Sequence, residues 1–352
     1  MGPNAFIRRS MGNERILVTG GAGYIGSHTI VELLAVPGIE VVSVDNLSNS
    51  DPAVFGRIAR ICGREVRNHV IDLCDARALD RMFANEAPFS GVIHFAAFKS
   101  VPESMADPRK YYHNNINSLL NILETSVRNG VPKFIFSSSC SVYGNIERMP
   151  VSETTPLGRA ESPYAHTKQV GERIVGEYAR AHPALAAISL RYFNPVGAHA
   201  SGQLGEDPIN PPSSLVPVIT RTAIGKMARV TVFGTDYPTR DGSCIRDYVH
   251  VSDIANAHVK ALDRAARNGT GVEVFNLGTG TGVSVLEAIA AFEQVSGMRL
   301  PYELGQRRSG DVGAIWSDTT RSREALGWKA ERDLLAMMGT AWAWERQRSE
   351  EK

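Results

Sequence analysis

The sequence predicts an α/β protein: a doubly wound parallel sheet with a second, smaller α/β domain. In the first half of the 352 residues, short apolar runs alternate with longer segments of helical character, the pattern of parallel strands joined by crossover helices. After Tyr192 this rhythm ends in a stretch rich in Gly, Pro, Asn and Ser, which is typical of loops. A chain of this length also exceeds one ordinary hydrophobic core. We therefore expect a first domain at 13–195 and a second at 196–345.

The elements of the first domain follow in order along the chain. Each predicted strand is a short apolar run, and several end at polar residues, where ligands of parallel sheets bind. The predicted strands are Ile16–Val18, Val41–Val44, Val66–Ile71, Gly91–Phe95, Phe134–Phe136 and Ala187–Tyr192. The predicted helices are Ile25–Leu34, Val54–Cys62, Ala78–Ala84, Tyr111–Asn129 and Tyr164–Ala181.

The second domain is predicted to be less regular. It starts with a loop and crossing segment over Asn194–Pro217, and a segment near 246–266 is expected to return to the first domain. The predicted strands are Val230–Phe233 and Val274–Leu277, and the predicted helices are Asp253–Ala266, Val285–Val295 and Asp333–Arg346. Residues 1–12 are expected to be a flexible extension.

Composition narrows the function classes. A formal charge of +1 provides no basic excess for a nucleic-acid partner, and no apolar run approaches the roughly 20 residues that span a bilayer. The cysteines have neither metal-ligand nor redox spacing, so we expect reduced thiols in a cytoplasmic protein and no metal. They are Cys62, Cys74, Cys140 and Cys244.

A glycine-rich turn lies between the first strand and the first helix. Gly20, Gly23 and Gly26 allow a tight turn, close approach of the backbone to a pyrophosphate, and close helix packing. Asp45, at the end of the second strand, suits the adenosine ribose hydroxyls and repels a 2′-phosphate, which favours NAD over NADP. An ordinary glycine turn is the alternative.

Further residues follow the third and fourth strands. Asp72 is placed to reach the adenine, although a capping Asp explains it equally well. Small residues after His94 allow the nicotinamide end of the cofactor to approach the backbone, and Lys99 can meet the pyrophosphate. His94 itself is expected to be a satisfied core histidine.

Tyr164 and Lys168 form a potential acid/base pair. They are four residues apart and share one face of a helix that Ser162 and Pro163 are suited to begin. A free tyrosine has a pKa of about 10. An ammonium roughly 5 Å away favours the phenolate by roughly 3 kcal/mol at an effective dielectric of about 20. A second cation, such as an oxidised nicotinamide, would complete the shift towards neutral pH. The same spacing also occurs on solvated helix faces.

Together these residues resemble the extended short-chain dehydrogenase/reductases, through the three glycines, Asp45, Asp72, Ser139 and the Tyr-x-x-x-Lys pair. Within that family the chain is similar to the UDP-glucose 4-epimerases. The supporting runs are Asp45–Leu47, Tyr111–Asn115, Arg191–His199 and Arg246–His250, and the resemblance extends from Arg15 to Trp342. It implies a Rossmann fold, NAD, a UDP-sugar substrate, and a homodimer formed through the helices at Tyr111–Asn129 and Tyr164–Ala181.

The resemblance implies reversible C4 epimerisation of UDP-glucose and UDP-galactose through a 4-keto sugar and transient NADH. Tyr164 would take the proton of the 4-hydroxyl, Lys168 would hold the nicotinamide ribose, and Ser139 would bind the reacting oxygen. The implied cofactor-binding residues are Gly20, Gly23, Tyr24, Ile25, Gly26, Asp45, Asn46, Asp72, Leu73, Phe95, Ala96, Lys99, Asn114, Tyr164 and Lys168. The implied substrate-binding residues are Ser139, Tyr164, Asn194, Ser214, Leu215, Arg246, Tyr248, Arg308, Asp311 and Ile315.

Arg246 and Arg308 would clamp the diphosphate, because guanidinium groups suit phosphate oxygens; surface ion pairs are the alternative. Two positions depart from the family. Ser213 and Ser214 replace two asparagines, so a phosphate or sugar contact there stays open. Ile315 replaces the Tyr or small residue that gates the sugar pocket, so epimerisation of UDP-N-acetylhexosamines stays an alternative.

Other functions fit the residues less well. A dehydratase needs an Asp-Glu pair where Cys140 and Ser141 stand, and a UDP-glucuronate 4-epimerase needs an additional cation. An NAD-sensing scaffold would typically lack Tyr164 or Lys168. Asp241, Asp247 and Asp253 are better explained by loop turns and a helix cap than by a metal site.

Overall fold

A computed structural model describes residues 13–350 except 210–211, 213, 270 and 309. The expectations for residues 1–12 and for Ser213 fall outside the described residues.

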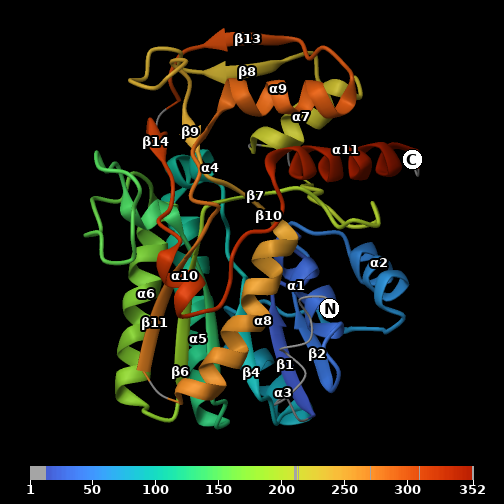
Figure 1. Ribbon diagram of the computed structural model, residues 1–352. Coiled ribbons are helices and arrows are strands. Elements are labelled where there is room, and N and C mark those ends of the chain that lie inside the picture. The colour runs from blue at the N-terminus through green and yellow to red at the C-terminus, as the bar shows by residue number, and fades with distance from the viewer. Residues whose placement is uncertain (1–12, 210–211, 213, 270, 309, 351–352) are drawn as a thin grey trace.

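The main sheet has seven parallel strands in the order β11-β6-β5-β4-β1-β2-β3 (Figure 1). The strands are β1 (Glu14–Thr19), β2 (Ile39–Val44), β3 (Arg67–His69), β4 (Gly91–His94), β5 (Lys133–Ser139), β6 (Ala186–Tyr192) and β11 (Gly271–Leu277). The strand order changes direction between β1 and β4, which is where open parallel sheets bind their ligands. The predicted doubly wound α/β fold is confirmed.

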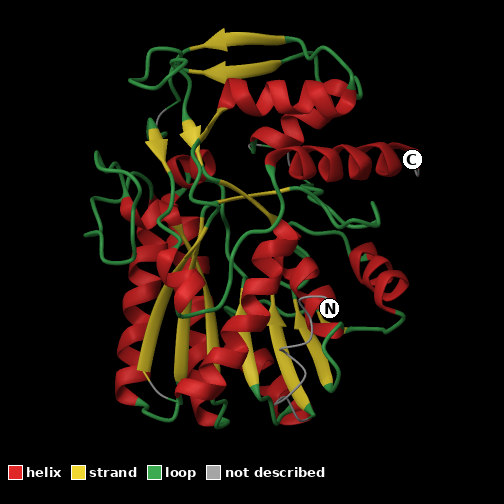
Figure 2. Cartoon of the chain, in the orientation of Figure 1, coloured by secondary structure: helices red, strands yellow, loops and turns green. Residues whose placement is uncertain are grey.

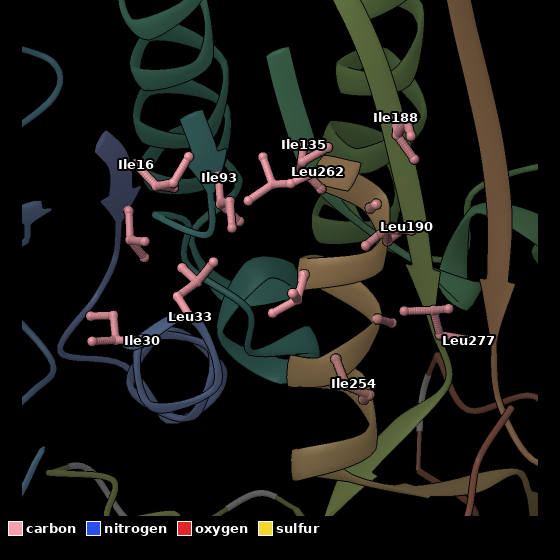
Figure 3. Packing of buried hydrophobic residues seen from close by; sticks show 14 of the residues in the cluster. Ile16, Ile30, Leu33, Ile93, Ile135, Ile188, Leu190, Ile254, Leu262 and Leu277 are labelled. Atoms are coloured by element: carbon pink, nitrogen blue, oxygen red, sulfur yellow. The ribbon is translucent and has the colours of Figure 1, made fainter. Parts of the chain in front are cut away.

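Helices cover both faces of this sheet (Figures 1 and 2). On one face, Ile30 and Leu33 of α1 and Leu262 of α8 pack on Ile16 and Ile135 of the strands (Figure 3). On the other face, apolar residues of α3, α5 and α6 pack on β1, β4 and β5. The helices of this part are α1 (Tyr24–Leu34), α2 (Ala53–Cys62), α3 (Ala76–Glu86), α4 (Val101–Ala106), α5 (Pro108–Arg128), α6 (Pro163–Ala181) and α8 (Val251–Asn268). A 3₁₀ helix, η3 (Cys140–Tyr143), follows β5.

A second group of elements lies beyond the carboxyl ends of these strands (Figure 1). Its core contains Ile219, Phe292 and Met338. The strands form three small sheets: β7 (Asn194–Val196) with β10 (Tyr248–His250), β8 (Val230–Phe233) with β13 (Tyr302–Gly305), and β9 (Ile245–Arg246) between β12 (Val283–Ser284) and β14 (Ala314–Ile315). The other helices of this group are α7 (Leu215–Ala223), α9 (Val285–Ser296) and α11 (Leu334–Glu350), whereas α10 (Thr320–Glu324) packs against β11 of the main sheet.

Besides η3, α10 and the short strands β7, β9, β10, β12, β13 and β14, none of which was predicted, three elements differ from the sequence predictions. β3 ends at His69, because the last hydrogen bond to its neighbour joins Asp45 N to His69 O, and Val70 beyond it is 65% exposed. α7 lies in a segment predicted as loop: Val216 and Ile219 bury one face of it, and Pro217 is tolerated in the first turn of a helix. α4 was not predicted.

The return of the chain to the main sheet extends beyond 246–266. β11 pairs with β6 along its whole length, from Gly271 opposite Ala186 to Leu277 opposite Tyr192, while α8 packs against α1. The division of the chain into two domains stays a prediction.

Candidate functional site

Two cavities lie at the carboxyl ends of the parallel strands. The first has a volume of about 250 Å³ and includes the glycine-rich turn in its wall. The second, about 540 Å³, lies between the main sheet and the second group of elements. Tyr24, Lys99, Tyr164 and Tyr192 line both. Tyr164 therefore stands where the contents of the two cavities meet.

The glycine-rich turn is built for close approach of the backbone. Gly20 has a φ of +70°, and a Cβ there would lie 2.7 Å from Ala96 N. A Cβ on Gly26 would lie 2.2 Å from Gly20 O. Only glycine fits both positions without moving backbone atoms, and the turn leads directly into the N-terminus of α1, which favours phosphate.

Asp45 is fixed by this turn and by its own loop. Its carboxylate accepts hydrogen bonds from Ala22 N at 3.0 Å and from Leu47 N at 2.9 Å. Burial raises its pKa, and these two hydrogen bonds oppose that rise. The carboxylate has lone pairs left to accept from the hydroxyls of a ribose.

The structure brings every predicted cofactor-binding residue to the wall of the first cavity. The individual contacts with a cofactor stay predictions. Asp72 lines the cavity and accepts from Cys74 N at 2.8 Å within its own loop, but it does not cap a helix, because the cap of α3 is Asp75. Lys99 pairs with Glu206 at 3.0 Å and lies 5.9 Å from the centre of the Tyr24 ring. A pyrophosphate would compete with that carboxylate for the Lys99 ammonium.

Tyr164 and Lys168 lie on α6, whose first turn is capped by Ser162 accepting from Ala165 N at 3.2 Å. Lys168 is buried; its ammonium donates to Ser137 O at 2.6 Å and Ser137 Oγ at 3.3 Å. It lies 6.0 Å from the centre of the Tyr164 ring. Burial lowers the pKa of Lys168 to about 7, against the attraction of Glu172 one turn further along.

The tyrosine is not made acidic by the chain alone. Burial raises the pKa of Tyr164 to about 12, and its hydrogen bond with Ser139 only partly opposes this effect. Lys168 was expected to lower this pKa, but the same desolvation weakens the protonation of Lys168 itself. A phenolate at neutral pH therefore requires additional positive charge beside Tyr164.

The predicted substrate-binding residues all line the second cavity; their contacts with a substrate stay predictions. Two arginines converge there on Asp311. Arg308 binds it through Nε at 3.1 Å and through NH2 at 3.0 Å, and Arg246 NH2 lies 3.8 Å away. Arg246 also donates to Val312 O at 2.8 Å. The ion pairs expected as an alternative are therefore present, and they are made by the same two guanidinium groups that line the cavity.

Ser214 and Ile315, the two positions that depart from the family, both line the second cavity but differ in burial. Ser214 is exposed and precedes α7 without capping it through its side chain. Ile315 is 3% exposed and packs with Val142, Tyr143 and Phe193 in a small apolar cluster. Asn194 contributes a buried side-chain oxygen that has no hydrogen-bond partner within the described part of the chain.

Several residues of the site were not identified from the sequence. Ser137 holds Lys168, although only Ser139 of that serine cluster was assigned a role. Glu206 lines both cavities, and α4 contributes Val101 and Pro102 to the second. The run of serines at 137–139 could have indicated Ser137 from the sequence, whereas no sequence pattern indicated Glu206 or α4 as part of the site.

The residues expected to be structural are held by hydrogen bonds within the protein, but the expected helix cap is wrong for Asp253, because the N-cap of α8 is His250. His94 is buried, and its Nδ1 lies 2.8 Å from Thr19 Oγ1. Burial and Lys168 lower its pKa to about 3. Asp253 accepts from the backbone N–H groups of Glu331 and Arg332. Over the described ranges, no group of three or more His, Cys, Asp and Glu side chains suits a metal ion. Within those ranges no helix is both long and apolar enough to cross a membrane.

Comparison with known proteins gives a consistent result. A sequence model of the NAD dependent epimerase/dehydratase family matches residues 16–278. A UDP-glucose 4-epimerase of Bacillus subtilis is 48% identical over 330 residues, covering 94% of this chain and 96% of that protein. The UDP-glucose 4-epimerase of Bifidobacterium longum, solved with NAD+ and UDP, has a TM-score of 0.92 and 43% identity, covering 95% of this chain and 99% of that one. A UDP-Glc/GlcNAc 4-epimerase of Campylobacter jejuni has a TM-score of 0.81 and 39% identity, with coverages of 95% and 99%.

The burial of Lys168 predicts a dependence of stability on pH. Between its lowered pKa of about 7 and the ordinary value of 10.5, the unfolded chain binds a proton that the folded chain lacks, so stability rises with pH. A Lys168→Met variant lacks this contribution. Urea unfolding between about pH 7.5 and 9.5, on protein freed of nucleotide, should show the wild type gaining up to about 1.4 kcal/mol per pH unit relative to the variant. Parallel curves would contradict the prediction.

Proposed function

This chain belongs to the NAD dependent epimerase/dehydratase family, and we propose that it interconverts UDP-glucose and UDP-galactose by inverting C4 with the help of NAD. The observation that carries the proposal is the position of Tyr164, in the shared wall of the cavity at the glycine-rich turn and the larger second cavity. A base at this junction reaches a sugar carbon and a nicotinamide at the same time.

The first cavity fits NAD on three observations of the chain itself. Gly20 and Gly26 let the turn pack closely on Ala96 and on itself, which brings the N-terminus of α1, a site that favours phosphate, to the cavity wall. Asp45 presents a carboxylate suited to a ribose without a 2′-phosphate. Lys168 lines the same cavity and would hold the second ribose. When bound, NAD supplies the two-electron acceptor and donor that oxidises C4 of the sugar and reduces it again.

Tyr164 and Ser139 would carry the proton chemistry at the sugar. Tyr164 accepts the proton of the 4-hydroxyl and later returns it, while Ser139 hydrogen-bonds the same oxygen. The hydrogen bond between the two side chains already favours the phenolate. Their positions at the start of α6 and the end of β5 hold them on rigid elements.

The second cavity would hold the nucleotide firmly and the hexose loosely. Arg246 and Arg308 would bind the diphosphate, with Asp311 orienting both guanidinium groups and accepting from the uridine ribose. The volume of about 540 Å³ lies within the range of about 300–1,000 Å³ that small ligands use. Inversion needs the 4-keto sugar to present its other face to Tyr164, so a tight fit around the hexose would oppose turnover.

A second candidate substrate is a UDP-N-acetylhexosamine. The Campylobacter jejuni relative is described as acting on both UDP-Glc and UDP-GlcNAc. In this chain Ile315, in the wall of the second cavity, is intermediate in size between the Tyr and the small residue that the family uses. The glucose and galactose forms remain our first proposal, because an isoleucine still fills much of the space that an acetamido group needs.

We also propose that the protein is a cytoplasmic homodimer that pairs through α5 and α6. Tyr112, Ile116 and Leu120 repeat every fourth residue on α5, as do His166, Val170 and Ile174 on α6. The two rows are adjacent, since Tyr112 OH lies 2.9 Å from His166 Nδ1. Ile116, Leu120 and Val170 are apolar yet only partly buried, as expected of a face that a second copy covers. The four cysteine thiols are free, which suits a reducing compartment.

The first test is turnover of UDP-galactose without added NAD. Purified protein that contains NAD should form UDP-glucose, and a Tyr164→Phe variant should lose about 10²- to 10⁴-fold in kcat while retaining its NAD. Tyr178→Phe is the matched control, because it removes a hydroxyl from the same helix that bonds Glu124 at 3.3 Å. Failure of the NAD-containing wild type to convert UDP-galactose would overturn the function. Full activity of Tyr164→Phe would overturn the assignment of the base.

The second test concerns the size of the sugar. Replacing Ile315 by Ala should raise the ratio of kcat/KM for UDP-N-acetylglucosamine to that for UDP-glucose at least about tenfold, since a few methylene groups are worth this much in a pocket. The ratio is measured on one preparation, so loss of folded protein cancels. An unchanged ratio would remove Ile315 as the gate. Equal kcat/KM values for the two sugars in the wild type would favour the second candidate.

The third test is the oligomeric state. Light scattering of the wild type should give twice the chain mass of 38.3 kDa. Val170→Arg places an unpaired charge in the proposed interface and should shift the mass to that of one chain. The control is Leu304→Arg, which alters a leucine that is 62% exposed on β13, in the second group of elements away from α5 and α6 (Figure 1), and should leave the dimer intact. A monomeric wild type would refute the dimer.

A further inference from the structure

We propose that Asp247 is a positioning residue that holds the walls of the second cavity in register. The motif Arg246–His250 supplied substrate-binding residues on either side of Asp247 but assigned no role to Asp247. The proposal deepens the function above, because it rests on the second cavity taking a UDP-sugar.

Asp247 is a fully buried carboxylate at 0% exposure. Its Oδ1 accepts from the backbone N–H and the hydroxyl of Thr279, both at 2.7 Å. Its Oδ2 accepts from Gly280 N at 3.1 Å, from Ser317 N at 3.0 Å and from Ser317 Oγ at 2.6 Å. All five donors are neutral, so the charge is satisfied by oriented dipoles and not by a cation.

The partners of Asp247 belong to segments that are remote in the sequence. Thr279 and Gly280 follow β11 of the main sheet, and Ser317 follows β14. The backbone carbonyl of Asp247 accepts from Asn194 N at 2.8 Å, next to the pairing of β7 with β10. One residue therefore ties the main sheet, β14 and the segment after β6 together.

Two of these segments, the one after β6 and β14, contribute to the wall of the second cavity, as does the strand before Asp247. Arg246 and Tyr248 are the chain neighbours of Asp247, and Asn194 is its backbone partner. Ile315 lies two residues before Ser317 and opposite Arg246 in the β9–β14 pairing. Arg246 of the proposed diphosphate site, Asn194 with its amide oxygen unpaired among the described residues, and Ile315 are thus all positioned through Asp247.

The site around Asp247 accepts only a carboxylate. A Cβ on Gly278 would lie 2.3 Å from Asp247 Oδ2 and 2.4 Å from Ser317 Oγ, so the space is filled. An ionised carboxylate only accepts hydrogen bonds, whereas an asparagine amide would turn two donors towards this shell. The three backbone N–H groups in the shell cannot become acceptors. Loss of the carboxylate should therefore release β14 and the Thr279 loop, and with them the alignment of Arg246 against Ile315.

The predicted consequence is a defect in substrate binding with chemistry preserved. Asp247 is not among the described residues that line either cavity, so it acts through its neighbours. Asp247→Asn should raise KM for UDP-galactose and the calorimetric Kd for UDP at least about tenfold. Its kcat should stay within about threefold and its NAD content should not change, because Tyr164, Lys168 and the first cavity lie on other elements.

Asp241→Asn is the matched control. Asp241 accepts from Ser243 N at 2.9 Å, Ser243 Oγ at 2.7 Å and the hydroxyl of Ser284, so its removal also breaks a carboxylate–serine cluster in the same part of the chain. Its partner Ser284 lies on β12, on the side of β9 opposite β14, and Asp241 makes no hydrogen bond to Ile315, Ser317 or Asn194 among the described residues. We expect any loss of thermal stability in this variant to leave KM and the Kd for UDP within about twofold.

If Asp247→Asn does not fold, the Ser317→Ala variant tests the proposal in its place. It removes one of five hydrogen bonds and should raise KM about two- to fivefold, and in the double variant the two effects should not add. Wild-type KM and Kd in Ser317→Ala, or an Asp247→Asn variant that loses kcat or NAD while KM is unchanged, would overturn the proposal. Binding of UDP is measured without turnover, so this test keeps its outcome even if UDP-galactose proves not to be the substrate.

Discussion

The site depends on keeping the ammonium of Lys168 inside the protein. Burial disfavours its charge, and the carbonyl of Ser137 at the end of β5 compensates through a hydrogen bond of 2.6 Å. Glu172, one helical turn after Lys168, adds the opposite charge and is itself bound by Arg191 of β6 through Nε at 2.8 Å and NH2 at 2.7 Å. Positive, negative and positive groups thus alternate from α6 to β6. The sheet must form before this arrangement can exist, so the chemistry is a consequence of the fold.

The same sheet explains why one tyrosine serves two cavities. Parallel strands end at one edge, and α6 begins at that edge beside β5 and β6. The glycine-rich turn after β1 lies to one side of Tyr164, and the segments after β6 and β9 lie to the other. The first side is backbone that tolerates no Cβ at Gly20 or Gly26, and the second is a wider wall of side chains. The closely packed turn and the wider second cavity therefore both border Tyr164.

Sequence reasoning succeeded where function depends on local spacing. The glycine turn, the strand ends at Asp45 and Ser139 and the helical pair Tyr164–Lys168 follow from periodicities of two and 3.6 residues, and the resemblance added the arginines. It failed where contacts join distant segments: Lys99 meets Glu206 across 107 residues, and Asp247 meets Ser317 across 70. No spacing rule reports such pairs. α7 was missed for a different reason, because Pro217 indicates a loop unless its place in a first turn is known.

The high pKa of Tyr164 in the chain alone has a functional meaning. A phenol with a pKa of about 12 keeps its proton at neutral pH, so Tyr164 is not a base in the chain alone. Lys168 cannot reverse this, since its own charge is weakened by the same burial. Positive charge arriving in the first cavity lies beside Tyr164 and lowers its pKa, and loss of that charge raises it again. The proton affinity of Tyr164 would then depend on the charge of whatever occupies the first cavity, and its role as a base would depend on that occupant.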